Sequence, residues 1–160
     1  MTIAVGDKIP DVELRRMGKR EPEALRSLDV LGRGKVVLFG LPGAFTPTCS
    51  DFHLPGYIVR AEDLKGKGVD LIACISVNDA YVMGAWGQAQ GTGDAVMMLG
   101  DGNGEFTRAV GLDYDMTAAG LGVRSRRYAM ILQDGVVTYL GVESQPGVSV
   151  SGADAVLAEL

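Results

Sequence analysis

The chain has 160 residues, of which 47% are apolar and 22% charged, an ordinary globular composition that suits a single domain over residues 1–160. Acidic residues outnumber basic ones and give a net charge of −5, so we expect no nucleic-acid surface. No apolar run approaches the roughly 20 residues that span a bilayer, so we expect no membrane segment. The two cysteines form no C-x-x-C pair, which argues against secretion and favours the cytoplasm.

The first half of the chain predicts a hairpin followed by a βαβ unit. Residues 1–34 alternate weakly and contain several glycines, which is typical of a short edge hairpin with an irregular lead-in. KVVLFGL at 35–41 predicts a strand buried on both faces, a helical pattern covers about 47–66, and VDLIACIS at 69–76 predicts the next strand. The two strands of such a unit should be parallel.

Two residues interrupt the first helical stretch. Pro55 and Gly56 lie inside it, so we expect either a kink or a division of the helix. Division would give a short turn that bears Cys49 and a longer segment from Tyr57 onwards.

A second helix and a third strand follow. Asn78 or Asp79 can cap a helix that runs to about Gln90. Its apolar face would comprise three residues: Val82, Trp86 and Ala89. VMML at 96–99 predicts another buried strand, and we expect turns around one short helix, EFTRAVG, over residues 100–123.

The C-terminal part predicts a hairpin and a helix. Residues 128–142 form two β-rich runs joined at Asp134-Gly135, a strong hairpin signal. Ser151 and Asp154 would then open a final helix.

Without residues 96–123, the predicted order is β-α-β-α-β-β-α. This is the order of the thioredoxin-like fold, an α/β architecture with a central mixed sheet flanked by helices. The chain would add an N-terminal hairpin and an inserted segment of strand and loop. In an open α/β sheet the reactive site lies beyond the carboxyl ends of the parallel strands, which is where Cys49 falls.

Cys49 is the strongest candidate for a reactive residue. Thr46 is a good N-cap and Pro47 suits the first helical position, so Cys49 would be the third residue of the first turn. The unpaired N–H groups and the helix dipole favour an anion there, which shifts the sulfur towards the nucleophilic thiolate. The alternative is a packed, unreactive side chain, the usual state of a free cysteine.

The stretch PGAFTPTC contains the P-x-x-x-T-x-x-C motif of the peroxiredoxins, in Pro42, Thr46 and Cys49. Further matches follow in register: His53, Pro55, Gly56, CISVND at 74–79, Trp86 and RSRRYAMIL at 124–132. The chain therefore resembles the type-II branch of this family over nearly its whole length. The resemblance implies a thioredoxin fold and a thiol peroxidase without a cofactor. It also implies hydrogen peroxide and small alkyl hydroperoxides as substrates, reduced through a Cys49 sulfenic acid.

The resemblance gives roles to three residues around the nucleophile. Pro42 would shield the sulfur from water, and the Thr46 hydroxyl would point to the sulfur or the substrate. Arg127 directly precedes the aromatic-led strand, as the family's active-site arginine does, and could donate to the thiolate and to peroxide oxygens. We expect Arg124 and Arg126 to be solvated charges.

His53 follows Cys49 by four residues, so the two would share a face of a continuous helix. A general base or a metal ligand is one interpretation. We favour a hydrogen-bonding role behind the thiol, because Cys49, His53 and Cys74 are the only soft ligands and none has the spacing of a metal-binding pair. We therefore expect no metal.

Cys74 lies in a predicted buried strand, where a packed side chain is the simplest interpretation. The alternative is a resolving cysteine, because some relatives have a second cysteine at a matching place. Others have one near the C-terminus, and SVSGADAVLAEL at 149–160 has none. We therefore expect an external reductant, which by resemblance is glutathione with glutaredoxin, or thioredoxin.

By resemblance we also expect a homodimer with contacts from the loop around Phe45 and from the 120s, for which Phe45, Trp86 and Leu121 are candidates. An alternative function is a redox-responsive binding or signalling protein that uses oxidation of Cys49 as a switch. Multiple turnover with a reductant would distinguish the two. A thiol-disulfide reductase is disfavoured, because the second position of a C-x-x-C pair would be Asp51 or Phe52.

Overall fold

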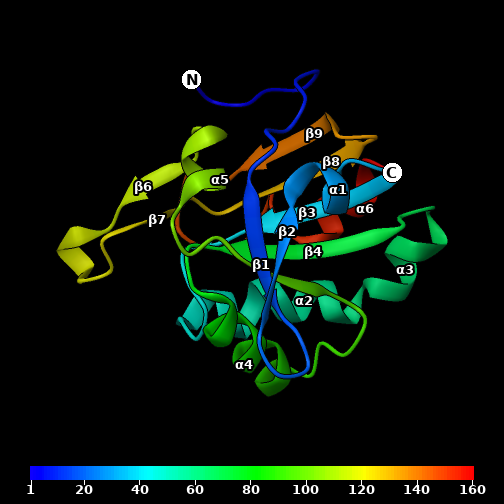
Figure 1. Cartoon of the computed structure of the whole chain (residues 1–160). Coiled ribbons are helices and arrows are strands. Elements are labelled where there is room, and N and C mark those ends of the chain that lie inside the picture. The colour runs from blue at the N-terminus through cyan, green and yellow to red at the C-terminus, as the bar shows by residue number, and fades with distance from the viewer.

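The computed structural model describes residues 1–160 and is built around one seven-stranded mixed sheet (Figure 1). In order across the sheet its strands are β2 (Pro22–Arg26), β1 (Glu13–Met17), β5 (Met97–Gly100), β4 (Leu71–Ser76), β3 (Lys35–Gly40), β8 (Tyr128–Gln133) and β9 (Val136–Val142). The neighbours β3, β4 and β5 are parallel, whereas β8 is antiparallel to β3 and β9 to β8. The structure confirms the predicted α/β fold and its central βαβ unit.

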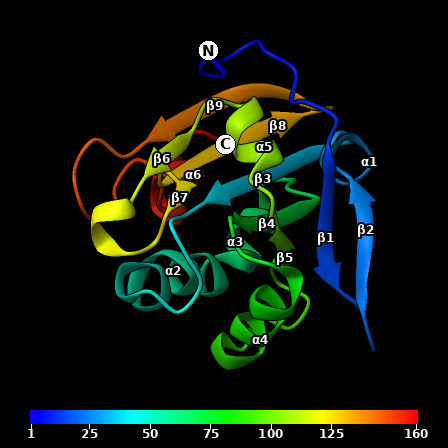
Figure 2. The ribbon, with the colours of Figure 1, turned by 60° about the vertical axis from the view of Figure 1, so that its left-hand side comes forward.

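Helices cover both faces of the sheet (Figure 2). One face packs against α2 (Leu54–Val59), α3 (Ala61–Gly66), α4 (Ala80–Gln90) and α6 (Ala153–Ala158). The other face packs against α1 (Ser27–Leu31) and α5 (Glu105–Ala109). Each face of the sheet has its own hydrophobic core, because successive side chains of β3 point to opposite faces. Val37 and Phe39 lie in the first core, and Val36 and Leu38 lie in the second. No helix is long and apolar enough to cross a membrane.

The predicted N-terminal hairpin and inserted segment are both present. The antiparallel pair β1 and β2 forms one edge of the sheet. The insertion contributes β5 to the sheet and α5 beside it. It also forms a separate ribbon of β6 (Asp113–Asp115) and β7 (Val123–Ser125), with the 3₁₀ turn η2 (Thr117–Ala119) at its tip (Figure 1). The sequence predicted only turns for this ribbon, because each of its strands has three residues and Ser125 is the only one of the six that is buried.

The predicted helix over 79–90 is confirmed, but its apolar face is partly wrong. The Asp79 side chain caps α4 by accepting from the Val82 N–H at 2.8 Å. Val82 is only half-buried and Ala89 is exposed. The buried positions are Ala80, Met83, Trp86 and Gly87. An α-helix turns by about 100° per residue, so the observed buried face is rotated about the helix axis relative to the predicted one.

The C-terminal hairpin is confirmed at its turn, where Asp134 and Gly135 have φ values of 51° and 82°. Two successive positive φ angles are what a two-residue type I′ turn requires. The predicted start of the last helix is wrong. α6 begins at Ala153, and no side chain caps it. Ser151 does not cap the helix because its hydroxyl instead donates to Glu143, at 2.6 Å.

Candidate active site

Cys49 lies just beyond the carboxyl end of β3. The helix begins at Pro47, as predicted, and widens at once into the π-helical turn η1 (Cys49–His53) before it continues as α2. Within this turn the Leu54 N–H donates to the Cys49 carbonyl, five residues earlier. In an α-helix the ring of Pro55 would clash with the carbonyl four residues before it, and a wider turn relieves that clash.

The expected short turn that bears Cys49 is therefore present, as η1. The segment after it begins at Leu54 rather than at Tyr57, so Pro55 and Gly56 lie inside α2, and a further break between α2 and α3 falls at Arg60. Pro55 is tolerated because it sits in the first turn of α2, where an N–H is dispensable.

Thr46 precedes the helix but does not cap it as predicted. Its hydroxyl donates to the Gly43 carbonyl at 2.7 Å, and its own carbonyl accepts from the Ser50 N–H at 2.9 Å. The hydroxyl thus ties the start of the helix back to the loop that contains Pro42 and Gly43.

Arg127 comes from the neighbouring strand and meets Cys49 directly. Tyr128 pairs with Gly40, so the residue before β8 lies beside the end of β3 from which the Cys49 turn departs. The Nη2 of Arg127 donates to the Cys49 Sγ at 3.2 Å. The Cys49 side chain is fully buried. Sheet register thus joins two residues that lie far apart in sequence.

His53 is buried and binds the same guanidinium. Arg127 Nη1 donates to His53 Nδ1 at 2.9 Å, and His53 Nε2 lies 2.9 Å from the Ser151 carbonyl oxygen. Because a guanidinium only donates and a carbonyl only accepts, the imidazole is neutral with its proton on Nε2. Burial, reinforced by the Arg127 charge, lowers the pKa of His53 from 6.5 to about 3. With both nitrogens engaged, His53 is not placed to act as a general base.

Cys74 lies on β4 beside Phe39 and is completely buried. Burial, and next the charge of nearby Cys49, raise the pKa of the Cys74 thiol well above its usual range. Both cysteines are free thiols in the structure. No group of three or more His, Cys, Asp and Glu side chains is arranged to hold a metal ion.

Arg124 is a site residue that the sequence missed. It was expected to be a solvated charge, but it is half-buried, and its Nη1 donates to the Pro42 carbonyl at 3.1 Å. Its Nε also donates to the Leu121 carbonyl at 2.9 Å. A Cβ on Gly43 would lie 2.7 Å from Nη1, so a larger residue there would push the guanidinium aside. Nothing in the polar run at 124–127 singles out Arg124 from Arg126, which is exposed and lies over the Tyr114 ring.

The sequence also missed a second set of contacts, which join the loop before Cys49 and the turn η1 to β4 and α4. Asn78 Oδ1 accepts from the Ala44 N–H at 3.0 Å and from the Ser76 hydroxyl at 2.7 Å. Trp86 Nε1 donates to the Ser50 hydroxyl at 3.0 Å. Trp86 is fully buried, so its predicted place in a dimer contact is wrong.

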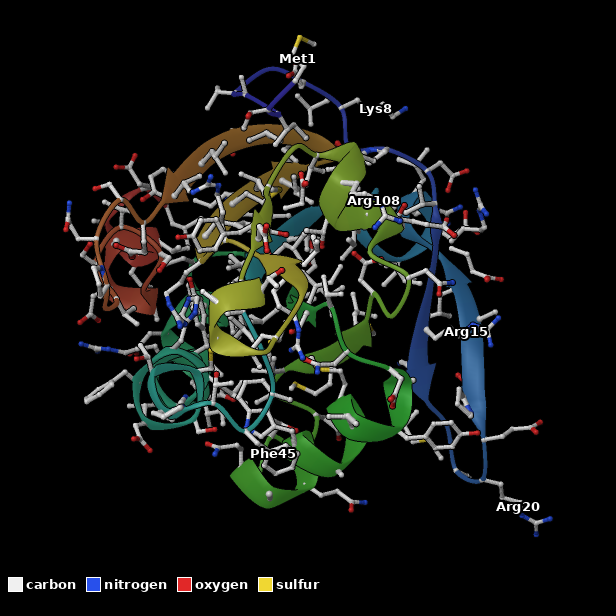
Figure 3. All side chains as sticks on the ribbon, turned by 90° about the vertical axis from the view of Figure 1, so that its left-hand side faces the viewer. Met1, Lys8, Arg15, Arg20, Phe45 and Arg108 are labelled. Atoms are coloured by element: carbon white, nitrogen blue, oxygen red, sulfur yellow. The ribbon has the colours of Figure 1, made fainter.

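Phe45 lies at the surface beside α4, where Figure 3 shows its ring. Its side chain is 57% exposed, and its ring centroid is 6.5 Å from that of Trp86. Phe45 has a φ of 64°, a conformation that is costly for a bulky residue. The loop therefore holds an apolar ring outward next to the Cys49 turn.

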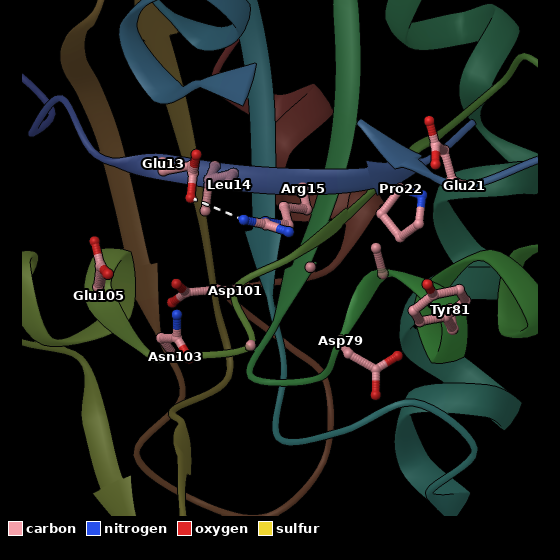
Figure 4. A pocket seen from close by; sticks show the side chains of 13 residues that line it. Glu13, Leu14, Arg15, Glu21, Pro22, Asp79, Tyr81, Asp101, Asn103 and Glu105 are labelled. Atoms are coloured by element: carbon pink, nitrogen blue, oxygen red, sulfur yellow. Dashed lines mark hydrogen bonds and ion pairs between the residues drawn. The ribbon is translucent and has the colours of Figure 1, made fainter. Parts of the chain in front are cut away.

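A cavity of about 550 Å³ lies elsewhere, between β1 and the start of α4 (Figure 4). Five of its thirteen lining residues are acidic: Glu13, Glu21, Asp79, Asp101 and Glu105. None of the predicted site residues lines it, so the cavity is separate from the Cys49 site.

Comparisons with known proteins show to which family the chain belongs. The Redoxin family model matches residues 4–157. Peroxiredoxin-2E-2, chloroplastic, of Oryza sativa subsp. japonica is 52% identical, over 99% of this chain and 73% of that protein. Peroxiredoxin-2B of Arabidopsis thaliana is 49% identical, over 99% of this chain and 98% of that protein.

Among solved structures, reduced Prx3 of Vibrio vulnificus in complex with hydrogen peroxide is 51% identical and superposes with a TM-score of 0.94. The match covers 99% of both chains. Together with the thioredoxin-like fold, these likenesses settle the family. The chain belongs to the peroxiredoxin family and is a thiol-dependent peroxidase.

Proposed function

We propose that Cys49 is the thiol that attacks the peroxide. The observation that supports this most directly is the contact of 3.2 Å between Nη2 of the half-buried Arg127 and the Sγ of the fully buried Cys49. A thiolate electron pair forms a bond to the terminal peroxide oxygen while the O–O bond breaks. The departing oxygen takes up a proton and leaves as water or an alcohol, and the sulfur becomes a sulfenic acid.

The transition state spreads negative charge over the sulfur and both peroxide oxygens. Arg127 is held in place to donate to that charge, and the Thr46 hydroxyl can rotate from Gly43 towards a bound peroxide. A donor fixed in a dry site contributes about 3 kcal/mol to such a transition state. Pro42, whose carbonyl is tied to Arg124, would form the wall that keeps water from the sulfur.

An external thiol completes the cycle in this proposal. Cys74 is fully buried within β4 and could reach the surface only if the sheet rearranged. Residues 149–160 contain no cysteine. We therefore assign Cys74 a structural role and propose glutathione with glutaredoxin, or thioredoxin, as the reductant. The proposed substrates are hydrogen peroxide, the molecule named with the Vibrio vulnificus Prx3 structure, and small alkyl hydroperoxides.

We further propose that the chain forms a homodimer and acts in the cytoplasm, although relatives in Oryza sativa and Arabidopsis thaliana are chloroplastic proteins. The dimer proposal is supported by two exposed aromatic side chains around Cys49: Phe45 is 57% exposed and Phe52 is 67% exposed.

Replacement of Cys49 tests the catalytic assignment. Cys49→Ser should abolish peroxide consumption in the presence of a thiol reductant, because a hydroxyl cannot replace the thiolate. Cys74→Ser is the matched control and should keep its activity. Peroxide reduction by Cys49→Ser at the wild-type rate would refute the assignment.

A further inference from the structure

Glu143 organises the loop that leads into the last helix. Its carboxylate accepts four hydrogen bonds, from the N–H and the hydroxyl of both Ser149 and Ser151, at 2.6 to 2.8 Å. Partial burial opposes ionisation, but these four donors outweigh it and lower the pKa of Glu143. The ionised side chain therefore fixes the backbone on both sides of Val150.

The Ser151 carbonyl, held by this arrangement, points into the core. It accepts from Tyr57 Oη at 2.7 Å and from His53 Nε2 at 2.9 Å. Ser151 and His53 are both buried, so no water competes for these bonds. The position of this one carbonyl therefore sets the rotation of the His53 ring.

The His53 ring in turn fixes the orientation of the Arg127 guanidinium. Arg127 forms no ion pair, and its only side-chain hydrogen bonds are Nη1 to His53 and Nη2 to Cys49. The Arg127 carbonyl accepts from the Glu143 N–H at 2.9 Å, which anchors the backbone but not the guanidinium. Without His53 in this orientation, the long side chain of Arg127 could adopt several other rotamers.

We propose that Glu143 is a positioning residue for peroxide reduction, acting through the Ser151 carbonyl and His53 to hold Arg127 at the Cys49 sulfur. The inference rests on the proposed roles of Cys49 and Arg127. The Glu143 side chain touches neither of them, so we expect it to act by fixing the positions of the Ser151 carbonyl and the His53 ring. Its negative charge also raises the pKa of His53, but this effect is smaller than the burial and the Arg127 charge that lower it.

Three substitutions separate geometry from charge. Glu143→Ala removes all four acceptor contacts and should lower the rate constant of the reduced protein with hydrogen peroxide about tenfold, as a displaced guanidinium predicts. Glu143→Gln should stay within about twofold of wild type, because an amide can accept three of the bonds and donate the fourth to Ser149. Glu62→Ala, on the exposed face of α3, is the control and should have no effect.

A double-mutant cycle with Arg127→Ala distinguishes positioning from general loosening. If Glu143 acts through Arg127, then Glu143→Ala should cause no further loss once Arg127 is absent. A full additional tenfold loss in that background, or an unchanged rate for Glu143→Ala alone, would overturn the proposal. Glu143→Asp keeps the charge on a shorter side chain, and it should show the same pattern at smaller size if Glu143→Ala does not fold.

The cycle also separates this inference from the function on which it rests. A wild-type rate for Arg127→Ala alone would refute the proposed role of Arg127. A strong effect of Arg127→Ala combined with no effect of Glu143→Ala would refute only the role of Glu143.

Discussion

His53 holds an arginine in place without neutralising it. A carboxylate in its position would pair with the guanidinium and compete with the Cys49 thiolate for the positive charge. The neutral imidazole offers one lone pair to Arg127 Nη1 and leaves the net charge of the guanidinium for the sulfur. Burial keeps the imidazole neutral, since its pKa is about 3.

This burial predicts a pH-dependent stability. His53 is the only histidine, and its pKa is 6.5 in the unfolded chain but about 3 in the folded protein. As pH falls below 6.5 the unfolded state takes up a proton that the folded state does not. The free energy of unfolding should therefore fall by up to about 1.4 kcal/mol per pH unit. Above pH 6.5 this effect should vanish.

Urea denaturation at pH 7, 6 and 5 would measure this dependence. His53→Gln, which keeps a donor and an acceptor but cannot gain a proton, should show little change in the free energy of unfolding between pH 7 and 5. Equal slopes for wild type and variant would contradict a buried, neutral His53.

At the scale of elements, the sequence predicted the strands and the last hairpin around the site but not the π-helical form of the turn that carries Cys49. Short apolar runs predicted β3 and β4, and Asp134-Gly135 predicted the turn of the last hairpin. These elements could be predicted because their signals are local in the sequence. The π-helical form of the turn at Cys49–His53 depends on Pro55 and on packing, and no local sequence pattern predicted it.

Residues that bind across long sequence distances were also missed. Arg124 meets Pro42 only because the ribbon of β6 and β7 brings it there. In the sequence Glu143 resembles an ordinary surface acid, and of its partners Ser149 and Ser151, the second was interpreted as the start of a helix. The family resemblance, by contrast, pointed to Cys49 through the P-x-x-x-T-x-x-C motif and to Arg127 through its place before a strand, and the sheet register brings the two into contact.

The cap of α4 gives a prediction at this scale. Asp79 accepts from the Val82 N–H, and the same helix carries the Trp86 that binds Ser50. Asp79→Ala should therefore lower the free energy of unfolding by about 1 kcal/mol. Chemical denaturation would measure it, with the exposed Asp94→Ala as a control. Equal stability of the two variants would show that the cap contributes nothing.

At the scale of the whole molecule, the exposed ring of Phe45 predicts self-association. Its strained backbone and 57% exposure leave an apolar side chain in water beside the active site. A second copy that covers this ring would recover the free energy of its burial, about 2 kcal/mol. Phe45→Asp should then shift the protein from dimer to monomer in sedimentation at micromolar concentration.

Tyr81→Asp provides a comparison, because Tyr81 is 62% exposed but lines the separate cavity. This variant should sediment as wild type does. A wild-type protein that is wholly monomeric at micromolar concentration would refute the dimer.

The most direct measurement is the intact mass of the reduced protein after one equivalent of hydrogen peroxide, with and without a dimedone trap, for wild type and Cys74→Ser. The proposed mechanism predicts one trapped adduct, located at Cys49, in both proteins. An absence of any adduct at Cys49 would contradict its role as the attacking thiol. Loss of two hydrogens in wild type but not in Cys74→Ser would instead reveal a disulfide and contradict resolution by an external thiol.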